Sequence, residues 1–226
     1  FSTAAGASAN ATGGKAPAFG RNSNAAGESA SAYGDGSSAI GEKASAYGVN
    51  ASAAGKFASA FGNGAAATGA FGSAYGTGAN AAGASASAFG NGAKASGESA
   101  SAFGDIAKAK GAFASAFGTG SNAAGPSASA YGPNASAAGD SSIAIGNDAT
   151  ATAYRIDSAN SAVVDANGKV AYKKDKNGNF VKVLADGKTE QLKDAADNPV
   201  NNIDIALNLA NADAKAAEGA VAVGWD

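Results

Sequence analysis

The residue types that most often carry out chemistry in proteins are scarce in this chain. Its 226 residues include no histidine, no cysteine and no methionine, which removes imidazole bases, thiol nucleophiles, disulfides and most zinc sites. Acids and serines are present, but they occur at turn and solvent positions with no histidine to activate them. We therefore predict a protein that is not an enzyme and that needs no cofactor or metal.

Binding is the chemistry that remains. Lys94, Lys108 and Lys110 form a basic group that is a candidate for docking an acidic ligand, against the alternative of an ordinary solvated surface. The stretches at 165–168 (DANG) and 175–179 (DKNGN) resemble half of a calcium-binding loop, but they lack its glutamate and its spacing. Hairpin turns are the favoured interpretation of both.

The net charge and the distribution of apolar residues limit the classes of partner that this chain could bind. The net charge of −2 gives no attraction to nucleic acid or to anionic lipid. No apolar stretch of about 18 residues and no signal peptide is present, so we expect no direct membrane contact by this segment. The chain starts and stops within a repeat, and we expect it to be a piece of a longer protein.

The elements that must position these residues come from that repeat. From Gly6 to Gly146 glycine recurs every seven residues, and alanine always stands two places before it. The residue immediately before the glycine is large in every second unit, so the full period is 14 residues. The large residues are Phe19, Tyr33, Tyr47, Phe61, Tyr75, Phe89, Phe103, Phe117, Tyr131 and Ile145.

Each period contains two different turns. After the glycine that follows a large residue, the second position is usually Asn or Gly, which predicts a turn with positive φ. The other turn has mostly Ser at that position, and Phe57, Phe71 and Phe113 are exceptions. These three rings could either staple neighbouring chains or contact a partner.

A β-solenoid explains the period best. A disordered chain has no reason to keep such a register, and glycine in every heptad would cost a coiled coil about 1 kcal/mol each time. We predict strands of about five residues joined by tight turns, with the small Ala/Ser face inside, because the opposite face would bury lysines without partners. The large residues then form an exposed stripe, which predicts that copies of the chain associate in parallel about an axis.

The repeat also resembles a known family. Its S-x-A-x-G unit, fullest at Ser142–Gly146 (SIAIG) and echoed at Ser37–Gly41 (SSAIG), is similar to the head repeat of trimeric autotransporter adhesins, the YadA-like heads. The resemblance covers residues 1–153. It implies an all-β, left-handed parallel β-roll, assembled as a homotrimer and displayed on the surface of a Gram-negative bacterium, anchored in the outer membrane through regions outside this chain. The ten large residues would then be the trimer-core positions, with Phe and Tyr here where Ile is more usual.

The repeat is interrupted near its end. Residues 154–218 have an ordinary composition, with Asn-Gly and Asp-Gly dipeptides typical of hairpins, and AVAVG at 220–224 restores the repeat unit. We interpret residues 154–218 as an inserted β-meander, with residues 202–215 open between strand and helix, and residues 219–226 as a resumed roll unit. Tyr172 and Phe180 in this insertion are further candidates for ligand binding, because loops on rigid scaffolds often carry function.

The expected function is a non-catalytic adhesin head. Its partners would be host matrix proteins, epithelial cell-surface receptors or other bacterial cells, and not nucleic acid. The alternatives are an ice- or surface-binding β-solenoid, which needs a flat threonine ladder where Thr12 and Thr68 stand isolated, and a purely structural spacer.

Overall fold

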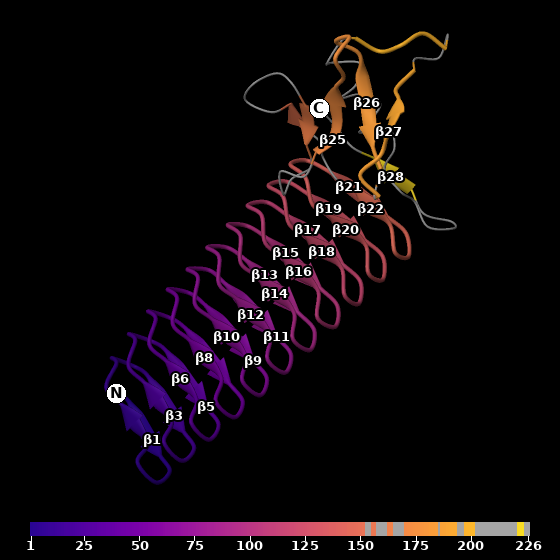
Figure 1. Ribbon diagram of the computed structural model, residues 1–226. Coiled ribbons are helices and arrows are strands. Elements are labelled where there is room, and N and C mark those ends of the chain that lie inside the picture. The colour runs from indigo at the N-terminus through magenta and orange to yellow at the C-terminus, as the bar shows by residue number, and fades with distance from the viewer. Residues whose placement is uncertain are drawn as a thin grey trace.

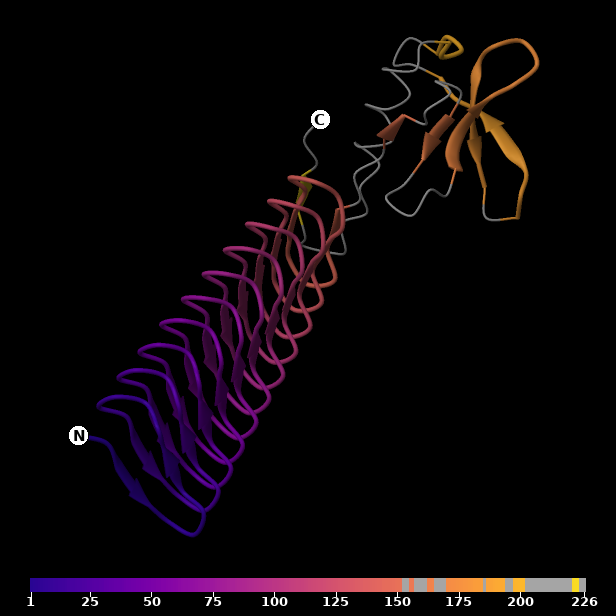
Figure 2. The same ribbon diagram turned by 90° about the vertical axis from the view of Figure 1, so that its left-hand side faces the viewer.

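The repeat folds into a long solenoid, followed in the chain by a small separate sheet (Figure 1). The computed structural model describes residues 1–151, 155–156, 162–164, 170–184, 186–193, 197–201 and 221–223. All the regular elements described are β-strands. The solenoid extends from the N-terminus as a rod of regular coils, and the small sheet lies at its far end (Figure 2).

Two parallel sheets run along the length of the solenoid. The first, whose strands end in the large residue of each period, contains β1 (Thr3–Ala5), β3 (Pro17–Phe19), β5 (Ser31–Tyr33), β7 (Ser45–Tyr47), β9 (Ser59–Phe61), β11 (Ser73–Tyr75), β13 (Ser87–Phe89), β15 (Ser101–Phe103), β17 (Ser115–Phe117), β19 (Ser129–Tyr131) and β21 (Ile143–Ile145). The second contains β2 (Asn10–Ala11), β4 (Asn24–Ala25), β6 (Ser38–Ala39), β8 (Ser52–Ala53), β10 (Ala66–Ala67), β12 (Asn80–Ala81), β14 (Lys94–Ala95), β16 (Lys108–Ala109), β18 (Asn122–Ala123), β20 (Ser136–Ala137) and β22 (Thr150–Ala151).

Successive coils pair in register with a shift of one full period. Ala74 lies opposite Ala88 in the first sheet, and Ala67 lies opposite Ala81 in the second. The parallel solenoid is therefore confirmed. Its strands are shorter than the predicted five residues, with three residues in the first sheet and two in the second, because the two turns take up most of each coil.

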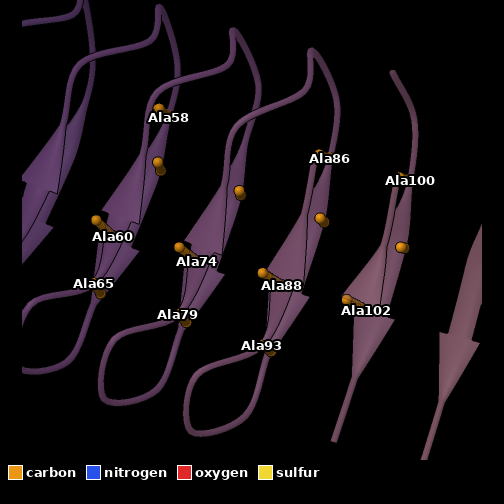
Figure 3. Close-up of a cluster of buried hydrophobic side chains, with 14 of the residues drawn as sticks. Ala58, Ala60, Ala65, Ala74, Ala79, Ala86, Ala88, Ala93, Ala100 and Ala102 are labelled. Carbon is orange, nitrogen blue, oxygen red and sulfur yellow. The ribbon is translucent and has the colours of Figure 1, made fainter. Parts of the chain in front are cut away.

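The interior consists almost entirely of alanine. Figure 3 shows how residues such as Ala58, Ala60 and Ala65 recur in rows from coil to coil, and each of these side chains has no exposed surface. Side chains this small let the two sheets approach closely, so the predicted thin core with alanine inside is confirmed. Some coils replace alanine by serine, and the buried Ser37 hydroxyl donates a hydrogen bond to the carbonyl oxygen of Gly34 at 2.9 Å.

The spacing of coils explains why glycine recurs every seven residues. A Cβ added at Gly83 would lie 2.5 Å from the carbonyl carbon of Gly97 and still closer to its oxygen. Ordinary van der Waals contact begins near 3.4 Å. Gly83 begins the serine-type turn, and glycine is required there because the backbone of the next coil comes so close. The φ of Gly83 is not in the left-handed region.

The sequence predicts a residue with positive φ at the Asn/Gly turn, but the structure has such a residue at both turns. Asn50 and Gly78 adopt it at the first turn, as predicted, with φ of 54° and 65°. At the second turn Ser85 and Phe71 adopt it as well, with φ of 55° and 59°. Serine and phenylalanine are not typical of this conformation, so composition could not reveal it.

The small sheet has five antiparallel strands in chain order. They are β23 (Arg155–Ile156), β24 (Ala162–Val164), β25 (Val170–Lys174), β26 (Phe180–Val183) and β27 (Thr189–Gln191). Gly178 and Gly187, with φ of 84° and 81°, lie in the last two hairpin turns, as their dipeptides predict. The boundaries 154–218 of the insertion remain a prediction, and residues 202–215 lie outside the described residues.

The last strand, β28 (Val221–Val223), returns to the solenoid in an unexpected direction. It pairs with β21 in the first sheet, but antiparallel, with Ala222 opposite Ala144. A resumed parallel coil at 219–226 was therefore the wrong expectation for this strand. The alternating small and large side chains of the AVAVG motif suit a sheet edge in either direction, and the local sequence cannot choose between them.

Candidate functional site

A continuous ladder of aromatic rings lies on the outer face of the first sheet. We call it the aromatic ladder; it consists of Phe19, Tyr33, Tyr47, Phe61, Tyr75, Phe89, Phe103, Phe117 and Tyr131, and Ile145 occupies the next rung. Neighbouring rings have centroids 4.8–5.1 Å apart and interplanar angles of 2–14°. The strand register imposes this stacking, because each ring follows the previous one after one full coil.

The aromatic ladder is only partly covered within one chain. Tyr131 and Ile145 are 40% and 46% exposed, and Phe19 and Tyr75 are both 36% exposed. Stacking buries the ring faces, but the edges remain open along the whole solenoid. An uncharged, aromatic surface of this length is what a protein interface uses, since removing each ring fully from water contributes roughly 1.5–3 kcal/mol.

The predicted lysine candidates lie on the second sheet, away from the aromatic ladder. Lys94 and Lys108 are opposite each other on β14 and β16, and Lys110 stands two residues beyond Lys108. All three side chains are exposed. The structure thus brings these three residues together on one flat face, and their role in ligand binding remains a prediction.

The other two candidate ligand-binding residues are not accessible. Tyr172 is 2% exposed and Phe180 has no exposed surface, so both pack inside the small sheet. Their backbones lie on the paired strands β25 and β26, and the ammonium of Lys174 lies 5.5 Å from the ring of Phe180. The assignment of these two aromatics to a binding surface was wrong, because both rings pack with Val181 and Val200 in the core of the small sheet.

The serine-type turns form a second edge of the solenoid that carries exposed aromatics. The rings of Phe57 and Phe71 stack with centroids 5.1 Å apart, and Phe71 is 58% exposed. The ammonium groups of Lys43 and Lys56 lie 5.1 and 5.2 Å from the Phe57 ring. The sequence analysis singled out the rings but not these lysines. Lys43 could have been placed beside Phe57, because residues 14 apart lie at the same position on neighbouring coils.

Acidic side chains occupy turns and form local ion pairs. Glu42 accepts from Lys56 at 2.8 Å, and this hydrogen bond is the main reason that the pKa of Glu42 lies below its ordinary value. Asp35 pairs with Arg21 in the adjacent coil, which raises the pKa of Arg21. Within the described ranges no three His, Cys, Asp or Glu side chains converge on a point that could hold a metal ion. In the same ranges no helix is long and apolar enough to cross a membrane.

Comparison with known proteins agrees with this architecture. The family model described as the YadA head domain repeat matches residues 18–37, 32–58, 81–105, 95–121, 109–135, 123–149 and 137–155. These matches overlap into two stretches, 18–58 and 81–155, which cover a little over half of the chain. Among curated proteins no sequence matches significantly.

Proposed function

Because the chain belongs to the YadA head family, the non-enzymatic, surface-exposed heads of trimeric autotransporter adhesins, we propose that it is an adhesin head that works as a parallel homotrimer. The observation that carries the proposal is the aromatic ladder, which is partly exposed in one chain and repeats at every coil. Three ladders meeting about a common axis would bury these rings together with Ile145. The first sheet would then be the interior of the assembly.

The second sheet and both turn edges would remain outside in such an assembly. They carry the charged side chains of the solenoid, including Lys94, Lys108 and Glu42. A rigid rod that presents the same surface three times gains affinity through multivalency, without any strong single contact. Host matrix proteins, epithelial surface receptors and other bacterial cells are the partners we propose. The left-handed sense of the roll and the outer-membrane anchor beyond this chain belong to the same proposal.

Solution mass tests the trimer directly. Light scattering of the purified protein should give three times the chain mass of 21.2 kDa. Replacing Phe61 and Phe89 by Ser removes two central rungs and should lower the stability of the assembly, while Phe71→Ser, on the turn edge, should leave the mass unchanged. A well-folded monomer for the unmodified protein would refute the trimer.

Adhesion is tested separately from assembly. Surfaces coated with matrix proteins, or cultured epithelial cells, should retain the trimeric protein, and retention should fall when the trimer is dissociated by the ladder variants. If the trimer binds no such surface, the result would refute adhesion and favour the role of a structural spacer.

A further inference from the structure

The two broad faces of the solenoid are almost free of charge. Every outward-facing strand position of the first sheet is apolar or an uncharged polar residue. On the second sheet the charged outward-facing residues are Lys94 and Lys108, and the exposed Lys110 directly follows strand β16. All three are positive and lie on neighbouring coils, whereas the acids of the solenoid lie at its turns.

No ion pair neutralises these lysines within the described solenoid. Arg21 pairs with Asp35, and Lys43 and Lys56 pair with Glu42. Lys94 and Lys108, by contrast, stand directly opposite each other on parallel strands. Like charges in this arrangement repel each other, so folding alone does not favour the pair.

Amide side chains continue the lysine row in both directions. Asn80 pairs in register with Lys94, and Asn122 pairs with Lys108. The side-chain oxygens of both asparagines are buried and accept no hydrogen bond from the described residues. Because these oxygens are inaccessible, only the N–H groups of the amides can meet a ligand. The amide of Asn122 already donates one long hydrogen bond, to the Ser136 hydroxyl at 3.5 Å, and its second N–H is left for a ligand. The row Asn80–Lys94–Lys108–Asn122, with Lys110 beside it, is therefore a strip of donors, which we call the donor strip.

We infer that the donor strip binds a linear sulfated polysaccharide that lies along the solenoid axis. Neighbouring rungs are ~4.8 Å apart, and Lys108 and Lys110 are separated by about 6.6 Å along the strand. A ligand that contacts all three ammonium groups at these spacings must carry several anionic groups at short, regular intervals. Hydroxyl and ring oxygens of the sugar would accept from the amides. This inference rests on the proposed function in one respect: within a trimer, the strip is free only if the subunits meet through the other sheet.

Other polyanions fit the strip less well. The side chains beside it are small, with Ala82, Ser96 and Ala124 in the adjacent row, so the strip lacks the aromatic anchor that protein interfaces use. It also lacks the aromatic side chains on which single-stranded nucleic acid stacks. Its lysines are point charges, which suit sulfate groups of variable orientation better than a bidentate arginine would.

The test uses the complete chain and a size-defined heparin hexasaccharide. Lys94→Asn, Lys108→Asn and Lys110→Ala together copy the residues of neighbouring rungs, so the fold should persist. The matched control is Lys15→Ser, Lys173→Ser and Lys176→Ser, which removes the same charge from other exposed sites. We expect the strip variant to bind about tenfold more weakly, as for the loss of three exposed ion pairs, and with a flatter dependence on salt. The control variant should bind like the unmodified protein.

Several results would overturn the inference. These are unchanged heparin binding by the strip variant, loss of binding in the control variant, or equal binding of a non-sulfated hyaluronan hexasaccharide, which has fewer anionic groups. Light scattering on the same samples separates this test from the proposed trimer. A monomer with lysine-dependent heparin binding would refute the trimer and support the strip, whereas a trimer without heparin binding would refute the strip alone.

Discussion

Replacing Gly83 by alanine should damage the solenoid far more than its small size suggests. The new Cβ would lie 2.5 Å from the carbonyl carbon of Gly97 and 3.0 Å from the amide nitrogen of Glu98. Both neighbours are backbone atoms, so no side chain can rotate away. The two coils must separate locally by roughly 1 Å to restore an ordinary contact.

The cost follows from the hydrogen bonds that cross this gap. The Ala82 amide donates to Ala95 at 2.8 Å, and the Ser99 amide donates to Ala84 at 2.8 Å. A separation of roughly 1 Å weakens both to near breaking, at about 1 kcal/mol each, and overpacking adds about 1–3 kcal/mol. We therefore expect Gly83→Ala to lower the free energy of unfolding by about 3–5 kcal/mol.

Gly78→Ala is the matched control. Gly78 has φ of 65°, and no atom lies within 4 Å of an added Cβ, so only the left-handed backbone opposes alanine, at about 1–2 kcal/mol. Guanidinium unfolding followed by circular dichroism compares the two variants, and hydrogen exchange at residues 82–99 shows whether the damage is local. If Gly83→Ala is no less stable than Gly78→Ala, close approach of the backbones is not the reason for glycine at this turn.

Three further predictions concern the turns and the core. Phe71→Ser should change the free energy of unfolding by less than about 0.5 kcal/mol, because Ser85 adopts the same positive φ one coil later; a larger loss in chemical denaturation would show that the ring staples the fold. Ser37→Ala should cost less than about 1 kcal/mol in the same assay, because the Ser37 amide still donates to Gly34; a greater loss would mean that the hydroxyl is needed. Glu42→Gln should make the melting temperature less dependent on pH in the acid range. The pKa of Glu42 is lowered from 4.5, chiefly by Lys56. The contribution of Glu42 to stability is therefore present above pH 4.5 and disappears as the pH falls through the lowered pKa. Parallel acid profiles for the variant and the unmodified protein would contradict this.

The insertion shows where sequence reasoning fails. Tyr172 and Phe180 lie in a segment without a repeat, and nothing at a fixed spacing from them indicates which side of a strand is covered. Both side chains proved to be buried. The direction of β28 was likewise hidden, because Val221 and Val223 alternate identically whether the strand runs parallel or antiparallel to β21.

The solenoid itself could be derived almost completely from the sequence. The period predicts the positions of its strands, though not their lengths. It also predicts the inward alanines, the outward ladder from Phe19 to Ile145 and the Asn/Gly turns, because every coil packs on a copy of itself 14 residues away. A periodic sequence therefore specifies the neighbours of each residue as well as its conformation.

Only the tertiary structure decided three other points. It showed that glycine is required at the serine-type turn by the neighbouring coil's backbone, as at Gly83, and that Phe71 adopts a positive φ there. It also showed that Asn80 and Asn122 bury their oxygens beside the lysine pair. Each was decided by how one coil packs on the next, and residue types and spacing by themselves do not encode that packing.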